Sequence, residues 1–136
     1  MDASMLVPLF LNDPFSARAE AFLSLRKPVA MVSDFAAAEF SSVLNRRVRT
    51  RESSEDEVRA AFQAFDRWTE TIAQSIECQP ADVRQADRFL RRLDLPLRAP
   101  DAIHIAMAQR LDAELATFDT KTVASAKALG VAVAPA

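Results

Sequence analysis

The sequence is poor in the residues from which several common active sites are built. It contains one glycine, Gly130, one histidine, His104, and one cysteine, Cys78. A phosphate-binding P-loop, a dinucleotide-binding fingerprint and a serine nucleophile elbow each need several glycines, so all three are excluded. A single histidine excludes zinc motifs built on histidine pairs, and a single cysteine excludes an internal disulfide and multi-cysteine metal sites. Any chemistry must therefore rest on carboxylates, hydroxyls and arginines.

The chain also lacks long hydrophobic runs and has a small net charge. The apolar run from Met5 to Leu11 contains Pro8 and is far too short to span a bilayer. No basic segment with an apolar signal core precedes it, so we expect a cytoplasmic protein with no membrane partner. The formal net charge of −2 gives no general attraction to nucleic acid, so phosphate binding would need a local patch. A chain of 136 residues can bury a substantial core, and we expect residues 1–136 to form a single domain.

Helical periodicity and capping residues predict most of the secondary structure. Helices are expected over about 5–11, 15–25, 34–48, 52–72, 79–95, 101–111 and 119–129. Short strands are expected over 29–32, 113–117 and 131–133. In the fifth of these helices, an apolar stripe is expected to face inward; it comprises Val83, Ala86, Leu90 and Leu93. The alternation of strands with helices predicts an α/β fold with a small parallel sheet between helices.

Asp101 lies at the start of the most apolar predicted helix. Pro100 tolerates only the first turn of a helix, so this helix is expected to begin at about Pro100 or Asp101. There the free N–H groups and the helix dipole favour an ionised carboxylate. His104 is expected to be a packed core histidine. The residues behind Asp101 predict a buried central helix; they are Ile103, Ile105, Ala106, Met107, Ala108 and Leu111.

Three more acids are predicted to approach Asp101. In a parallel α/β sheet, the residues between a strand and the next helix gather in one crevice. Asp2 precedes the first helix, Asp119 directly follows a predicted strand, and Glu39 lies about one and a half turns into the helix after Ser33. Four ionised carboxylates cannot coexist so closely without a cation. An all-oxygen ligand set favours Mg²⁺ or Mn²⁺, so we expect a metal site.

Each of these residues also has a purely structural interpretation. Asp2, Asp101 and Asp119 occupy positions where aspartate caps a helix or complements its dipole. Glu39 borders an apolar stripe and can simply reach solvent. The arginine run from Arg46 to Arg51 is either a solvated helix face or a phosphate clamp beside the metal.

Four short motifs, in this order, resemble those of the PIN-domain ribonucleases, and in detail the VapC toxins of prokaryotic toxin–antitoxin operons. They are Asp2-Ala3-Ser4, the segment from Ser33 to Glu39, the segment from Pro100 to Ala106, and the segment from Ala116 to Asp119. The resemblance spans essentially the whole chain. It implies a PIN-like three-layer α/β/α fold and a Mg²⁺- or Mn²⁺-dependent endoribonuclease that leaves 5′-phosphate and 3′-hydroxyl ends.

The same resemblance assigns roles to residues and implies partners. The acidic positions of the family, both catalytic and metal-binding, correspond to Asp2, Glu39, Asp101 and Asp119. Its accompanying hydroxyls correspond to Ser4 and Thr117, which would help to position the substrate, and Arg46 would hold a substrate phosphate. The expected partners are an RNA substrate, a cognate VapB-type antitoxin and a second copy of the chain in a homodimer.

One departure from the family leaves an alternative function open. Members usually carry a short β-strand before the first aspartate, whereas only Met1 precedes Asp2 here. Without that strand we expect Asp2 to be held by fewer backbone hydrogen bonds. The alternative is therefore a catalytically inactive PIN-fold protein-binding module, which Mn²⁺ titration would distinguish from the nuclease. A phosphatase with an aspartate nucleophile fits less well, because no second acid stands two residues after Asp2.

Overall fold

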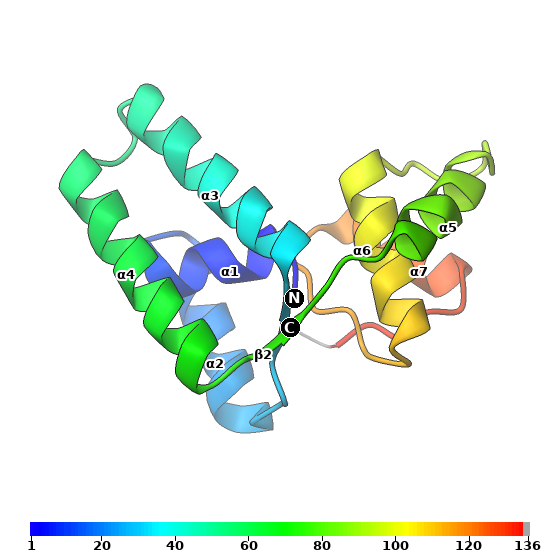
Figure 1. The fold of residues 1–136 in the computed structure, drawn as a ribbon, viewed down its shortest axis with the longest axis horizontal. Coiled ribbons are helices and arrows are strands. Elements are labelled where there is room, and N and C mark those ends of the chain that lie inside the picture. The colour runs from blue at the N-terminus through cyan, green and yellow to red at the C-terminus, as the bar shows by residue number, and fades with distance from the viewer. Residues whose placement is uncertain (135–136) are drawn as a thin grey trace. The chain divides into compact units, whose positions relative to one another are not determined.

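The computed structural model describes residues 1–134, and the chain divides into two compact units, Met1–Glu77 and Cys78–Ala136. The expectation of a single domain over residues 1–136 stays a prediction. The first unit contains α1 (Ala3–Phe10), α2 (Ser16–Arg26), β1 (Met31–Ser33), α3 (Asp34–Arg49), α4 (Glu55–Thr71) and β2 (Gln74–Ile76). The second contains α5 (Pro80–Leu90), α6 (Ala99–Arg110) and α7 (Thr120–Ala128), as Figure 1 shows. All seven predicted helices are therefore confirmed.

Side-chain caps fix where the helices of the first unit begin. Asp2 caps α1, and the Ser33 hydroxyl caps α3 by accepting a hydrogen bond of 2.9 Å from the Ala36 N–H. Ser54 and Glu57 form a capping box at the start of α4, in which each side chain accepts from the other residue's backbone N–H. Such caps satisfy N–H groups that the helix itself leaves unbonded. They are local in sequence, which is why the starts of α1 and α3 were predictable, whereas α4 begins at Glu55 and not at Glu52 as predicted.

The first unit contains a two-stranded parallel sheet. β1 pairs with β2 in the register Met31↔Gln74 and Ser33↔Ile76. β1 begins at Met31 and not at Val29 as predicted; Val29 is 67% exposed and lies before the strand. β2 was not predicted, because the strand has only three residues, which are mostly exposed and form no apolar run.

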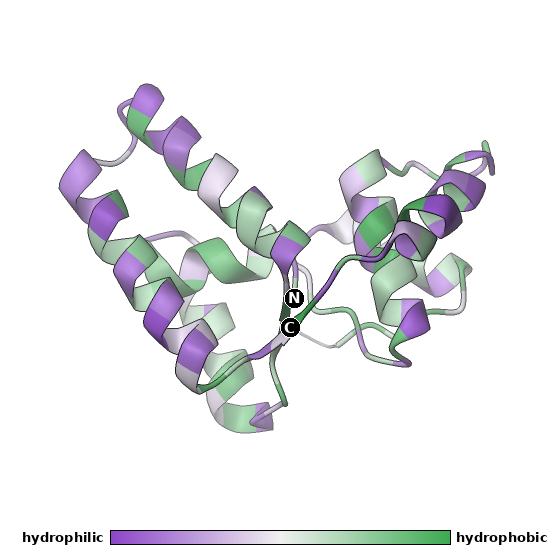
Figure 2. Ribbon diagram, in the orientation of Figure 1, coloured by the Kyte–Doolittle hydropathy of each residue, from purple (hydrophilic) through white to green (hydrophobic). Residues whose placement is uncertain are grey.

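Aromatic side chains from three helices form the core of the first unit. Phe40 of α3 stacks on Phe65 of α4 with ring centroids 4.4 Å apart, and Phe10 of α1 meets both rings edge-on. Such contacts add to the free energy gained by burying the rings. Figure 2 shows the hydrophobic residues of α4 turned toward this core and its hydrophilic residues turned outward. The predicted helix extends to Ile72, whereas α4 ends at Thr71 and Ile72 is 68% exposed.

Arg47 ties α3 to the turn between α1 and α2. Its Nη2 lies 2.5 Å from Asp13 Oδ2, and both side chains are largely buried. Its Nη1 donates to the Asn12 carbonyl, 3.4 Å away. One member of the predicted arginine run is therefore structural.

The buried face of α5 differs from the predicted one. The residues that face inward are Asp82, Ala86 and Phe89, whereas Val83 is 50% exposed and Leu93 is 96% exposed. The prediction of Val83 and Leu93 as core residues was wrong, because the buried face of α5 includes Asp82 in place of Val83 and the helix ends at Leu90, before Leu93. A buried ion pair makes the alternative face favourable.

That ion pair joins the start of α5 to the end of α6. Asp82 is 2% exposed, and Arg110 donates to it from Nε and Nη2 at 2.7 and 2.9 Å. The Gln79 N–H donates to Asp82 Oδ2 as well, at 2.8 Å. Burial acts to raise the pKa of Asp82, but the hydrogen bonds from Arg110 and Gln79 and the Arg110 charge together lower it below its ordinary value. The pair therefore stays ionised and holds the two helices together.

The two predicted strands of the second unit are reduced to a single parallel bridge. It joins Leu115 to Val133, with hydrogen bonds from Leu115 to Ala132 and from Ala134 to Leu115. Gly130 lies between α7 and this bridge at a φ of +73°, where a side chain would be strained. The predicted parallel pairing is confirmed, while the predicted lengths, 113–117 and 131–133, were too long. Within residues 1–134, no helix is both long and apolar enough to cross a membrane.

Candidate functional site

Asp2 is held firmly at the start of α1. It is 7% exposed, and its Oδ1 accepts hydrogen bonds from the Ser4 hydroxyl at 2.7 Å and the Met5 N–H at 3.2 Å. On its other side, the Met1 amino group donates to the Met31 carbonyl at 3.0 Å, which fixes it beside β1. Burial lowers the pKa of this amino group, and the charge of Asp2 partly opposes that shift. Ser4 therefore orients the acid.

Glu39 lies on α3, which packs against α1. Its neighbour in sequence, Phe40, is fully buried, whereas Glu39 itself is half-buried at the edge of that face. The Ser33 cap and the stacking of Phe40 fix the backbone that carries Glu39. The first unit thus presents Asp2 and Glu39 from two packed helices.

Asp101 lies in the first turn of α6, as predicted. Its Oδ2 accepts a long hydrogen bond of 3.4 Å from the Arg98 N–H, and the residue is half-buried. The helix behind it is buried from Ala102 to Ala108 except at half-buried Ile103, and His104 is 5% exposed, as expected of a core histidine. The positive end of the α6 dipole therefore faces a carboxylate carried on a rigid helix.

Asp119 begins α7, also as predicted. Its Oδ1 accepts from the backbone N–H groups of Lys121 at 2.7 Å and Thr122 at 3.1 Å. The hydroxyl of Thr117, which is 4% exposed, accepts from the Asp119 N–H at 3.0 Å. Thr117 thus fixes the backbone at the acid in the second unit, as Ser4 fixes the carboxylate in the first.

The chemistry of these four residues fits a hard divalent cation. All their donor atoms are carboxylate oxygens, and the capping hydrogen bonds of Asp2 and Asp119 use Oδ1 and not Oδ2. Each unit by itself supplies two of the four acids. Among residues 1–134, no group of three or more histidine, cysteine, aspartate or glutamate side chains is arranged to hold a metal ion. The metal-binding role of the four acids stays a prediction.

The arginines of α3 divide into two kinds. Arg47 is committed to Asp13, as described above. Arg46, the predicted phosphate-binding residue, is exposed and forms no ion pair with any other residue in the described range 1–134. The sequence run alone gave no means of separating the two, because the Asp13 partner lies 34 positions away.

Comparisons with known proteins concern the family and the fold of the chain. A family model described as "PIN domain" matches residues 1–128. The crystal structure of VapC20 from Mycobacterium tuberculosis, described as a sarcin-ricin loop cleaving toxin, superposes with a TM-score of 0.72. The two sequences are 22% identical, and the match covers 91% of this chain and 92% of that one. A comparison with curated proteins gives no match.

Proposed function

This chain belongs to the PIN-domain family, and we propose that it is a metal-dependent endoribonuclease, the toxin of a type II toxin–antitoxin pair. The observation that carries the proposal is the family match over residues 1–128, which includes Asp2, Glu39, Asp101 and Asp119. Asp2 and Asp119 cap helices, Asp101 lies in the first turn of α6 and Glu39 in the second turn of α3, so all four side chains sit on helical or capping backbone. A constellation held in this way suits catalysis, which needs precise positions.

The proposed metal is Mg²⁺ or Mn²⁺, held by the four acids. When bound, the cation supplies a more acidic water and positive charge beside the reacting phosphate. One of the carboxylates would accept a proton from the attacking water, whose oxygen then bonds to phosphorus while the bond to the 3′ oxygen breaks and that oxygen takes a proton from solvent water. The products are a 5′-phosphate and a 3′-hydroxyl. Ser4 and Thr117 keep Asp2 and Asp119 in place, and Arg46 binds a phosphate of the substrate.

The family also suggests where the protein acts and which partners it has. As a VapC-type toxin, the protein acts in the cytoplasm on RNA, forms a homodimer and is inhibited by a small VapB-type antitoxin. The fold likeness to VapC20, which is described as cleaving the sarcin-ricin loop, supports a ribonuclease toxin. It does not extend that RNA target to this chain.

Cleavage of a fluorogenic RNA in Mg²⁺, in Mn²⁺ and in excess chelator tests this function. We expect Asp101→Asn to abolish cleavage while the protein keeps its far-ultraviolet circular dichroism. Asp112→Asn is the matched control, because it makes the same change just beyond the other end of α6. Asp112 has a φ of +48°, which asparagine tolerates. Metal-independent cleavage by the wild type, or full activity of Asp101→Asn, would contradict the proposal.

A further inference from the structure

The segment between Glu39 and Glu52 has a charge pattern unlike the rest of the chain. The whole sequence has 19 acidic and 17 basic residues, yet residues 40–51 contain no acid. They contain four arginines: Arg46, Arg47, Arg49 and Arg51. A locally basic segment in a chain of net charge −2 is the local patch that phosphate binding requires.

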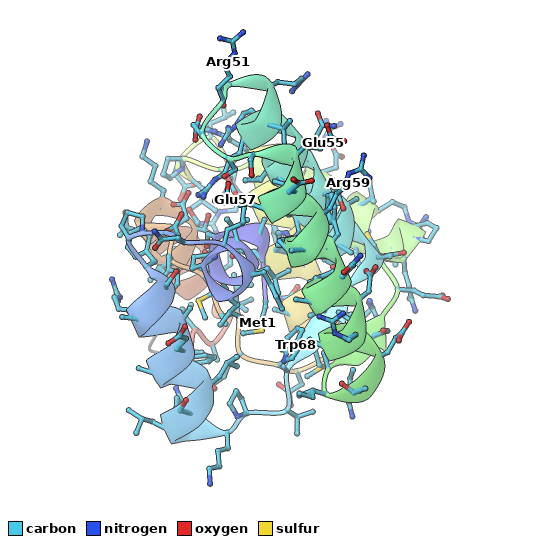
Figure 3. The ribbon with its side chains drawn as sticks, turned by 90° about the vertical axis from the view of Figure 1, so that its left-hand side faces the viewer. Met1, Arg51, Glu55, Glu57, Arg59 and Trp68 are labelled. Carbon is cyan, nitrogen blue, oxygen red and sulfur yellow. The ribbon has the colours of Figure 1, made fainter. Side chains whose placement is uncertain are left out.

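Among the residues that the structure describes, three of these arginines have no acidic partner, although four arginines outside this segment do have one. Ion pairs join Arg59 to Glu55, Arg91 to Asp87, Arg92 to Asp94 and Arg110 to Asp82. In contrast, Arg46, Arg49 and Arg51 are exposed and form no ion pair within the described part of the chain. Figure 3 shows Arg51 extending outward from the turn after α3, whereas Glu55 and Arg59 lie together on α4. Two positive charges on the end of α3 and one on the turn are therefore available to a ligand.

Helix geometry aligns two of these arginines with Glu39. Residues 39, 42, 46 and 49 are separated by three, four and three positions, so they share one side of α3. The opposite side, with Phe40 and Leu44, is buried in the core. At about 1.5 Å per residue, Arg46 lies about 10 Å and Arg49 about 15 Å from Glu39 along the helix axis. Exposed Ser42 adds a small hydrogen-bonding group to this side, and exposed Asn45 adds one at its border.

We propose that Ser42, Asn45, Arg46 and Arg49, named here the α3 track, bind the backbone of single-stranded RNA within a few nucleotides of Glu39. The inference rests on the proposed function and adds Ser42, Asn45 and Arg49, together with the direction in which the RNA leaves the acids. Repeated phosphates along an RNA strand match repeated guanidinium groups along one helix face. Ser42 and Asn45 donate hydrogen bonds to phosphate or ribose oxygens between Glu39 and Arg46.

The arginines also lie in the last turn of α3, where positive charge stabilises the negative end of the helix dipole. That structural role needs no RNA, so the test uses a property that it does not affect. This property is the salt dependence of RNA binding. Each phosphate contact in a single strand contributes about 0.7 to the slope of log affinity against log salt concentration.

The experiment measures fluorescence anisotropy of a labelled short oligouridine, with chelator present to prevent cleavage. Proteins compared are the wild type, Arg46→Gln, Arg49→Gln, the double variant and the control Arg67→Gln. Arg67 is an exposed residue of α4, so its change removes the same charge from another surface. We expect each α3 substitution to lower the slope by about 0.7 and the double variant by about 1.4. Arg67→Gln should leave it unchanged.

The outcomes separate the α3 track from the proposed function. If the wild type cleaves RNA but the double variant keeps the slope of Arg67→Gln, the track is wrong and the nuclease assignment stands. If the wild type neither binds oligouridine nor cleaves RNA, both are wrong. Circular dichroism of every variant confirms that the binding data come from folded protein.

Discussion

The buried ion pair between Asp82 and Arg110 gives the strongest single prediction about stability. Asp82→Ala removes the acceptor of two Arg110 hydrogen bonds and of the Gln79 N–H. Breaking a buried pair by removing one partner costs about 3–5 kcal/mol, mostly because a charge is left behind without compensation. The Arg110 side chain is 27% exposed and can turn partly to water, so we expect the lower end of that range, about 3 kcal/mol.

Urea unfolding followed by far-ultraviolet circular dichroism measures this loss. The matched control is Asp87→Ala on the same helix, which removes an ion pair to Arg91 whose side chains are 58% and 77% exposed. We expect the control to change the unfolding midpoint far less, since exposed ion pairs contribute little. Replacing both partners, as Asp82→Leu with Arg110→Met, should recover much of the loss, because no unpaired charge remains. An Asp82→Ala effect no larger than that of the control would refute the structural role of the pair.

Two further predictions concern pH and the aromatic core. Because the pKa of Asp82 is lowered in the folded state, its contribution is present above its ordinary value of 3.8 and is lost as pH falls through the folded-state value. Urea titrations at decreasing pH should therefore show the stability difference between wild type and Asp82→Ala shrinking in acid; a constant difference would contradict this sign. Phe40→Ala should lower the free energy of unfolding by about 3–5 kcal/mol, because Phe40 is fully buried among aromatic rings. Urea unfolding followed by Trp68 fluorescence measures this loss, and we expect a lower unfolding midpoint for Phe40→Ala. An unchanged midpoint would show that the first unit does not depend on that ring.

The PIN fold predicted from the sequence is confirmed, and the reason lies in short-range signals. Asp2, Ser33 and Asp119 each cap the helix that follows them, and Gly130 takes the positive φ that ends the last helix region. These signals act over a few residues, so one sequence suffices to see them. The order of the four motifs then carried the resemblance to the family.

What the sequence did not reveal depends on contacts between distant residues. The face of α5 that is buried is decided by Arg110, 28 positions from Asp82, so periodicity alone favoured Val83 wrongly. In the same way, only the contact with Asp13 separates structural Arg47 from exposed Arg46. β2 is held by pairing with β1, and its own residues carry no strand signal.

The candidate site was predictable to a similar degree. The sequence placed each acid at a helix start or border, and these local positions agree with the structure. Ser4 donates a hydrogen bond to the Asp2 carboxylate, and Thr117 accepts one from the Asp119 N–H. The binding of one metal ion by all four acids stays a prediction.

Calorimetric titration with Mn²⁺ measures whether these carboxylates bind a divalent ion. The comparison includes wild type, Glu39→Gln, Asp101→Asn and the control Asp112→Asn. We expect the wild type and Asp112→Asn to bind Mn²⁺. Glu39→Gln and Asp101→Asn should each lose at least about tenfold in Mn²⁺ affinity, as changes near metal sites typically cause. Absence of Mn²⁺ binding by the wild type, or equal affinity in all four proteins, would contradict the metal-binding role of these acids.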